Sequence, residues 1–357
     1  MQNETHPTDA HQIDNPPLVS VIIKTLNEEA GIAATILSIR AHMASIAHEI
    51  VVADSLSTDN TQQIARDLGV MVVSLSDADD RCCGVGHQLG YLHSKGEYLL
   101  LLDGDMKLEA GFVPEAIAYL EAHTDYAGVA GRVEMDEAHN YEFESRKQRI
   151  NQIYPLGDVS HLSGGGLYRR SAIDDIGYLT NQNLHAFEEA ELGIRLTQAG
   201  YKLHRLDIPY FFHSSYTLST FELLKRRWQS KYLCGPGELL RSAWGTPYFS
   251  QSLRTVKTLA AFSLYLVGVV AALLLAIGFG CWSLFGLSLL PVCAFFGLKA
   301  WQNRSLKAAG LSVINLSVFS AGLIRGLCLK QKPATKTPKH QIIAQSQDVS
   351  EQPFDSK

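Results

Sequence analysis

The chain has 357 residues, of which 46% are hydrophobic and 19% are charged, with a formal net charge of −5. This length accommodates one large soluble domain and a further segment, and an apolar excess in the last third indicates sequence outside a globular core. The six cysteines form no C-x-x-C pair and no metal-ligand spacing, which excludes a cysteine-held metal centre.

Residues 1–17 are polar, lack the apolar segment of a signal peptide and are predicted to be a disordered tail. Strands alternate with helices over the next part of the chain, which predicts an α/β domain over residues 18–217 with a doubly wound, mostly parallel sheet. The predicted strands cover residues 18–25, 48–53, 70–74, 98–102 and 127–133, and the clearest helices cover 61–68, 86–94 and 188–199.

Two predicted strands end on acidic residues, namely Asp54 and the triplet Asp103-Gly104-Asp105. Parallel sheets bind ligands at the carboxyl ends of their strands, so these residues predict a site for a nucleotide and a divalent metal. Two structural interpretations stay open at this point: Asp54 can cap a helix, and the triplet can form a solvated turn.

The last third of the chain carries the apolar excess. Residues 218–257 form a basic interfacial segment with seven Lys or Arg against two Glu, and residues 258–329 form a predicted membrane region. Residues 258–280 are uncharged and long enough to span, residues 281–298 are marginal, and residues 308–329 form either a third span or an element lying in the interface. The positive-inside rule puts the soluble domain in the cytosol, and residues 330–357 are predicted to be a disordered tail.

Five sequence blocks follow one another over residues 18–213. They are VSVIIKTLNE (19–28), VADSLSTDNT (52–61), KGEY (95–98) leading to DGD (103–105), GGGLYRR (164–170) and FEEAEL (187–192) with its continuation to residue 201. They resemble the blocks VSVIIPTYNE, VVDSGSTDGT, KGEY…LDAD, GGNGAFRR and EDxDLxxRLxxAGY of family 2 glycosyltransferases. No single block is decisive, but five in this order are specific.

The resemblance implies a GT-A fold, followed here by C-terminal membrane helices. It implies inverting transfer of a sugar from a nucleotide-diphosphate sugar, with Mg²⁺ or Mn²⁺ neutralising the pyrophosphate leaving group. Asp105 is the implied metal ligand, and His213 matches a position that can face the metal or the diphosphate. The implied nucleotide-sugar contacts, with Asp54 reading the base and the glycines approaching the sugar, are Thr25, Glu28, Asp54, Asp103 and Gly165.

The resemblance also implies that Glu189 is the general base that deprotonates the acceptor hydroxyl, with Glu188 beside it to orient the acceptor. A Glu at the place of the family's Asp leaves the choice between the two open, and both could instead be favourable charges at a helix N-terminus. Arg227 and Trp228 belong to an incomplete Q-x-x-R-W motif. They flank the acceptor or serve as an interfacial anchor.

These features predict a multi-pass enzyme of the inner or plasma membrane with a cytoplasmic catalytic domain. The expected partners are a nucleotide-sugar donor, a lipid-linked or glycan acceptor and the membrane, with no nucleic acid. The expected setting is exopolysaccharide, capsule or glycolipid assembly. Two alternatives remain: a non-catalytic membrane scaffold, since Leu26, His87 and Leu224 depart from the family pattern, and a nucleotidyltransferase that releases pyrophosphate.

Overall fold

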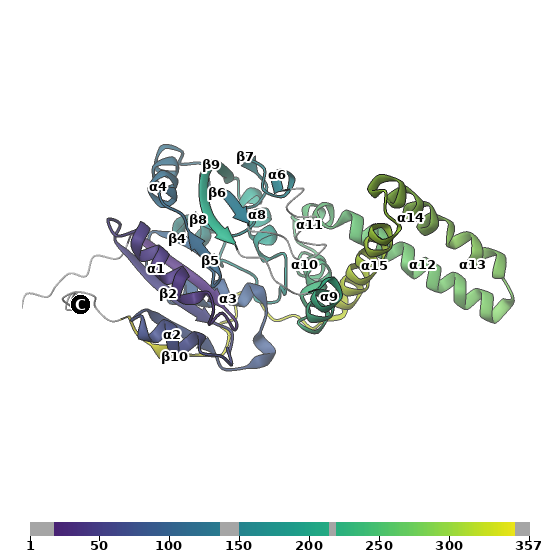
Figure 1. The fold of residues 1–357 in the computed structure, drawn as a ribbon, viewed down its shortest axis with the longest axis horizontal. Helices are drawn as coiled ribbons and strands as arrows, with labels where there is room; N and C mark the ends of the chain where they lie inside the picture. Colours follow the sequence, from purple (N-terminus) through teal and green to yellow (C-terminus); the bar gives the residue numbers. More distant parts are fainter. Residues whose placement is uncertain (1–17, 136–149, 214–218, 347–357) are drawn as a thin grey trace, which may run out of the picture.

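The computed structural model describes residues 18–135, 150–213 and 219–346. Ten strands within these ranges form one sheet in the order β10-β3-β2-β1-β4-β8-β6-β9-β5, with β7 paired to β9. A helical arm extends from this α/β domain (Figure 1). The strands are β1 (Val19–Thr25), β2 (His48–Asp54), β3 (Met71–Leu75), β4 (Tyr98–Asp103), β5 (Met106–Leu108), β6 (Tyr126–Met135), β7 (Gly157–Val159), β8 (Gly166–Arg169), β9 (Lys202–His213) and β10 (His340–Ala344).

Strands β3, β2, β1 and β4 run parallel to one another, as the sequence predicts. They are Val-, Ile- and Leu-rich and buried, which is typical of strands covered on both faces by helices. The helices of the domain are α1 (Ile32–His42), α2 (Thr61–Asp67), η1 (Ala78–Asp80), α3 (Cys83–Leu92), α4 (Phe112–Ala122), α6 (Ile150–Ile153), α7 (Arg170–Asp175) and α8 (Glu188–Gln198).

Beyond β4 the sheet is mixed rather than mostly parallel. Strand β8 is antiparallel to both β4 and β6, β9 is parallel to β6, and β5 and β7 are antiparallel to β9. Hydrophobic patterning identifies a strand, but the direction of pairing follows from the path of its connections, so the sequence pattern did not predict this half. Strand β5 directly follows the turn after β4 and pairs with the end of β9.

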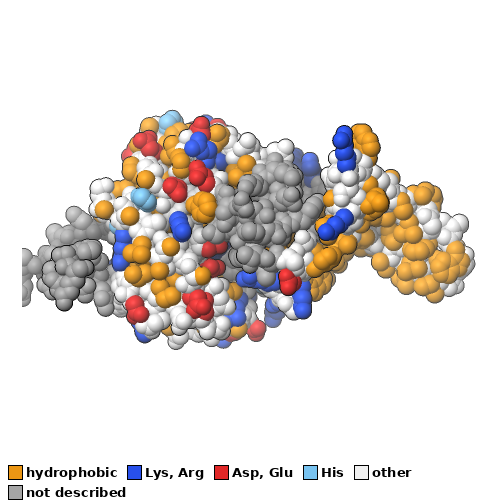
Figure 2. Space-filling view, in the orientation of Figure 1, with side chains coloured by type: hydrophobic (Ala, Val, Ile, Leu, Met, Phe, Trp, Pro, Cys, Tyr) orange, Lys and Arg blue, Asp and Glu red, His pale blue; other side chains and the backbone are white. Residues whose placement is uncertain are grey.

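Helices α9 (Thr220–Gln229), η2 (Tyr232–Cys234), α10 (Gly235–Ser242) and α11 (Phe249–Thr255) join the domain to the arm. The arm itself consists of α12 (Lys257–Phe279), α13 (Trp282–Ser288), α14 (Leu290–Asn303) and α15 (Leu306–Cys328). Within the described ranges, three segments are long and apolar enough to cross a membrane: α12, the α13–α14 pair and α15. Figure 2 shows hydrophobic side chains covering the far end of the arm.

The chain after α15 returns to the domain, which corrects the prediction of a disordered tail starting at residue 330. Strand β10 pairs antiparallel with β3 and becomes the edge of the sheet. Ahead of it, the side-chain amide of Gln182 donates to the carbonyls of Pro333 (2.7 Å) and Ala334 (3.2 Å). Backbone pairing at an open sheet edge holds this segment, so its polar composition did not reveal it.

Candidate functional site

The predicted acidic residues meet at the carboxyl ends of the central parallel strands. In the strand register, Lys24 at the end of β1 lies opposite Asp103 of β4, and Thr25 lies opposite Asp54 of β2. This edge of a parallel sheet is where α/β folds bind ligands. The structure therefore brings the two acidic strand ends together, as the sequence predicts.

The triplet Asp103-Gly104-Asp105 forms a tight turn between β4 and β5. The Gly104 N–H donates to the Lys24 carbonyl (3.1 Å), and the Gly104 carbonyl accepts from the Thr35 hydroxyl (2.9 Å). A Cβ on Gly104 would lie 2.9 Å from Cγ of Glu28, so only glycine lets Glu28 pack this closely. Both aspartates remain partly exposed at the mouth of the site.

Carboxylates crowd this turn. Burial, together with the nearby charges of Asp105 and Asp103, raises the pKa of Glu28 to about 8. The described residues contain no group of three or more His, Cys, Asp or Glu side chains arranged to hold a metal ion. Mg²⁺ is usually held by one or two carboxylates together with substrate phosphates and needs no site built entirely from protein ligands. The carboxylates at this turn fit that mode of binding.

His213, the second predicted metal residue, ends strand β9. Its backbone pairs with Met106, the residue that follows Asp105. The register therefore brings His213 beside the Asp103-Gly104-Asp105 turn, 108 positions away along the chain, although its side chain lies outside the described part of the structure. Its metal role stays a prediction.

The structure gives Asp54 and Thr25 partners within the protein, and their contact with the nucleotide stays a prediction. Asp54 is fully buried, and its carboxylate accepts hydrogen bonds from Thr25 Oγ1 (3.2 Å), the Ser57 N–H (2.9 Å) and Ser74 Oγ (3.0 Å). Gln62 donates to the same carboxylate. A carboxylate with this many internal donors holds the turn after β2 in place.

Glu188 and Glu189 lie in the first turn of α8 and face different partners. Glu189 Oε2 accepts from the Gly164 N–H at 3.0 Å, and Oε1 accepts from the Gly165 N–H at 2.6 Å. Both glycines have φ of +80°, the left-handed region that lets successive N–H groups point at one carboxylate. Gly165 therefore holds Glu189, and its contact with the donor sugar stays a prediction.

The two glutamates also differ in exposure and charge environment. Glu188 is buried, and its Oε1 accepts from Lys24 Nζ at 2.9 Å, whereas Glu189 is partly exposed. Burial and the neighbouring Glu188 charge raise the pKa of Glu189 to about 7. A partly exposed carboxylate that titrates near neutral pH suits a general base. The geometry thus favours Glu189 over Glu188 for that role.

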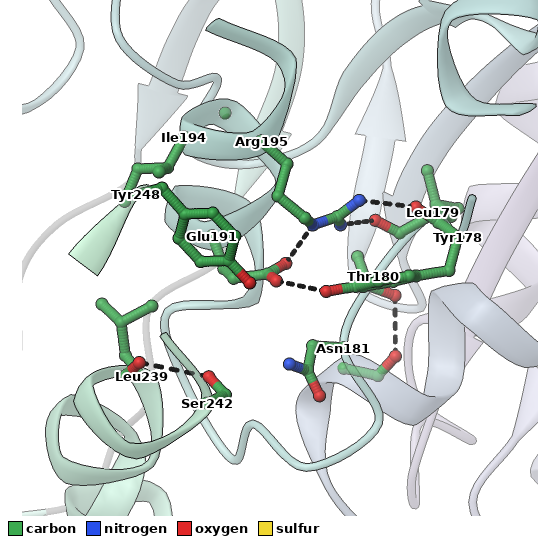
Figure 3. A network of polar contacts seen from close by, with 12 residues as sticks. Tyr178, Leu179, Thr180, Asn181, Glu191, Ile194, Arg195, Leu239, Ser242 and Tyr248 are labelled. Carbon is green, nitrogen blue, oxygen red and sulfur yellow. Dashed lines mark hydrogen bonds and ion pairs between the residues drawn. The ribbon is translucent and has the colours of Figure 1, made fainter. Parts of the chain in front are cut away.

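Behind the two glutamates, a polar network fixes α8 in place (Figure 3). Glu191 accepts from Arg195 Nε at 2.9 Å and from the Tyr178 hydroxyl at 2.6 Å. Arg195 also donates to the carbonyls of Tyr178 (2.8 Å) and Leu179 (2.7 Å). The second half of the block FEEAELGIRL (residues 187–196) therefore holds the first half, which carries Glu188 and Glu189, in position.

Breaking this network is expected to destabilise the domain. Arg195→Met leaves the fully buried Glu191 carboxylate without its cation, a change that typically costs about 3–5 kcal/mol and lowers the apparent Tm by roughly 10 °C. Thermal unfolding of detergent-solubilised protein measures this shift. The matched control is Lys202→Met, which removes the exposed Lys202–Asp125 ion pair and should cost less than about 1 kcal/mol. Equal shifts in the two variants would contradict the structural role.

Arg227 and Trp228 lie near the end of α9. The Arg227 guanidinium lies 4.7 Å from the centre of the Tyr232 ring, and Trp228 is 39% exposed. Arg325 of α15 donates to the Trp228 carbonyl at 3.0 Å and lies over its ring. These contacts join α9 to the arm and fit the interfacial interpretation of the two residues, while their acceptor role stays a prediction.

Three features of the site were not singled out from the sequence. Lys24 lies between Glu188 and Asp103. The fully buried Arg205 donates to the carbonyls of Gly131 and Ser163, just before the glycines that hold Glu189. Glu238 of α10 accepts from the His185 N–H and pairs with its ring at 2.8 Å. The local pattern that pointed to one of them was Lys24 itself, a charged residue in the mostly apolar strand β1.

The comparison of this sequence with known proteins agrees with the resemblance of the five sequence blocks. Residues 20–177 match the family model described as glycosyl transferase family 2. A 123-residue stretch is 31% identical to the low-salt glycan biosynthesis hexosyltransferase Agl6 of Haloferax volcanii, covering 34% of this chain and 29% of that protein. A 152-residue stretch is 28% identical to the chondroitin synthase of Escherichia coli, covering 41% of this chain and 22% of that protein. The matches thus span less than a third of either relative.

A solved structure extends the comparison to the fold. The mannosyltransferase PcManGT from Pyrobaculum calidifontis, in complex with GDP-Man and Mn²⁺, aligns with a TM-score of 0.53 at 16% identity. The alignment covers 88% of each chain. At this identity the likeness bears on the fold alone, and it confirms the GT-A class that the sequence blocks imply.

Proposed function

We propose that this chain, whose residues 20–177 match the family model described as glycosyl transferase family 2, transfers a sugar from a nucleotide-diphosphate sugar to an acceptor hydroxyl. The observation that carries the proposal is the arrangement at one sheet edge. A partly exposed Glu189 with a pKa of about 7 shares this edge with the carboxylates of the Asp103-Gly104-Asp105 turn. The first group suits proton removal, and the second suits binding of a divalent cation that would neutralise a charged leaving group.

In the proposed reaction the acceptor oxygen attacks the anomeric carbon while the bond to the nucleoside diphosphate breaks, which inverts that carbon. Glu189 takes the acceptor proton as the attack proceeds. The N–H groups of Gly164 and Gly165 orient its carboxylate and leave further lone pairs of both oxygens for the acceptor. Glu188 does not act as the base, because its carboxylate is buried against Lys24.

Asp105 is the proposed protein ligand for Mg²⁺ or Mn²⁺, together with oxygens of the donor diphosphate. When bound, the ion supplies neutralisation of the negative charge that develops on the leaving diphosphate. Asp103 contacts the donor beside it and is kept in place by Lys24, 3.2 Å away. Glu28 adds a third carboxyl group at the same turn.

The acceptor is proposed to be lipid-linked and to reach the site from the membrane. Helix α9 carries Arg226 and Arg227 between the donor site and the arm, and Arg226 lies close enough to Glu28 to lower its pKa. Basic side chains beside an apolar segment attract anionic headgroups, and a polyprenyl phosphate or diphosphate carries that charge. Assembly of an exopolysaccharide, capsule or glycolipid is the proposed setting.

The arm is proposed to cross the membrane an even number of times. Helix α12 starts beside the domain, and the chain after α15 is back on it, where Gln331 donates to the Glu238 carbonyl (2.9 Å) and β10 joins the sheet. Three crossings would separate these two ends by the bilayer. In Figure 1, α15 lies between the domain and the outer part of the α12–α13 hairpin. We infer that α12 and the α13–α14 pair cross, that α15 lies at the interface, and that the domain is cytoplasmic.

Two native cysteines test this topology. Cys281 lies at the tip between α12 and α13, Cys328 ends α15, and both are exposed. In intact cells, a membrane-impermeant maleimide is expected to label Cys281 from outside and to reach Cys328 only after the membrane is opened. Cys281→Ser and Cys328→Ser variants assign the signals. Labelling of both residues, or of Cys328 alone, from outside would contradict the hairpin.

Release of nucleoside diphosphate from a panel of nucleotide sugars tests the function itself. Detergent-solubilised protein is incubated with each donor, Mn²⁺ or Mg²⁺, and a membrane lipid extract. Release that needs both the ion and the extract supports the transferase and identifies its donor. Release of pyrophosphate would point to a nucleotidyltransferase instead, and nucleotide binding without turnover on any donor would favour a scaffold.

A further inference from the structure

A lysine side chain lies under the acidic site, at the end of a strand that is otherwise apolar. Lys24 is the sixth residue of β1, and its side chain is 18% exposed. Its Nζ lies 2.9 Å from Glu188 Oε1 and 3.2 Å from Asp103 Oδ1. One ammonium group therefore bridges the first turn of α8 and the strand that ends in the Asp103-Gly104-Asp105 turn.

The surrounding chain makes room for this side chain. A Cβ on Gly86 of α3 would lie 2.7 Å from Cβ of Lys24, so a glycine there allows the lysine stem to pass. Burial alone would lower the pKa of Lys24, but the charges of Asp103 and Glu188 outweigh it and hold that pKa well above its usual value. The group is a permanent cation with two fixed carboxylate partners.

The two partners belong to opposite sides of the proposed reaction. Asp103 belongs to the donor-binding turn, whereas Glu188 directly precedes the proposed base Glu189 on α8. Arg195 and Glu191 fix the next turn of α8 against residues 178–179. The Lys24 ammonium joins the first turn of the same helix directly to the donor strand, through its ion pairs with Glu188 and Asp103.

We propose that Lys24 is a positioning residue that sets the distance between the general base and the donor by binding Glu188 and Asp103 together. The inference rests on the proposed function, because the distance matters only if Glu189 and the donor react. Its physical basis is orientation: a displacement of about 1 Å in a reacting group can cost about 100-fold in rate. Lysine is not imposed by the family pattern, whose opening block VSVIIPTYNE carries proline here.

The test is a double-variant cycle on detergent-solubilised full-length protein, with nucleoside diphosphate release as the assay. Lys24→Met keeps the length of the stem and removes the charge, and it is expected to lower kcat about 100-fold. Glu188→Gln is expected to lower kcat by a similar factor. The double variant is expected to lose no more than either single variant, because both changes remove the same contact.

Lys24→Arg distinguishes positioning from bulk folding. Because it keeps the cation, its kcat is expected to be at least tenfold higher than that of Lys24→Met. Apparent Tm values of all variants show whether each protein folds. If Lys24→Met does not fold, Lys24→Arg and Glu188→Gln still test the bridge through their kcat and donor KM values. A bridge that only positions changes kcat far more than the donor KM.

Three outcomes would overturn the inference while wild-type turnover is intact. They are full kcat in Lys24→Met, losses that multiply in the double variant, and a rise in donor KM that accounts for the whole effect. Losses that multiply would mean that Lys24 and Glu188 act independently. An effect confined to donor KM would mean that Lys24 acts on donor binding. An absence of turnover in the wild type, by contrast, would remove the proposed function and with it this inference.

Discussion

Glu189→Gln is expected to lower kcat about 10²- to 10⁴-fold, the range that a positioned general base contributes. The amide keeps nearly the shape of the side chain but cannot take the acceptor proton. Wild-type kcat is expected to rise with pH through about 7 and then level off, because Glu189 must lose its proton to act and its pKa lies near that value. Glu189→Gln should lose this acidic limb.

The controls separate chemistry from folding. Glu115→Gln changes an exposed glutamate on α4 and should leave both kcat and its pH dependence unchanged. Glu189→Asp shortens the side chain by one methylene and is expected to keep part of the activity together with the limb. A Glu189→Gln protein with an unaltered pH profile would show that another group is the base.

Asp105→Ala is the second change with a large expected effect. Removing the proposed metal ligand should lower turnover about 10³-fold, since a bound divalent cation contributes several kcal/mol of charge stabilisation. The remaining turnover should no longer depend on added Mn²⁺ or Mg²⁺. Initial rates measured against metal concentration in the presence of saturating donor check both points.

The metal experiment also needs a variant that removes an acidic residue elsewhere. Asp67→Ala, at the exposed end of α2, should retain wild-type turnover and the wild-type metal dependence. An unchanged apparent Tm for Asp105→Ala shows that the fold is kept. Should Asp105→Ala keep full, metal-dependent turnover, the ion would have to bind elsewhere.

Much of the site could be predicted because its residues lie in short blocks with local signals. The apolar run of β4 ending in Asp103-Gly104-Asp105 was identified from its composition alone, and the structure puts this turn at the ligand-binding edge. Asp54 was located correctly at the end of β2, but its partners within the protein were not predicted. Its hydrogen-bond donors Gln62 and Ser74 come from α2 and β3, which no local pattern connects to it.

The glycines illustrate the same limit. GGGLYRR indicated a stretch where backbone approaches another group closely, and the structure agrees. The partner in the structure is the carboxylate of Glu189, 24 positions from Gly165, which the local pattern did not indicate. The polar segment before β10 was missed for a related reason, since pairing to a sheet edge uses backbone groups that every residue carries.

The sequence by itself determined the order of strands and helices, the acidic strand ends and the apolar arm, because burial and amphipathic periodicity are written in neighbouring residues. Only the tertiary structure decided how these parts combine. The Lys24–Glu188 contact joins residues 164 positions apart, and the pairing of β10 with β3 brings the chain after the arm back to the domain. Such contacts depend on chain path and pairing direction, which short-range periodicity does not encode.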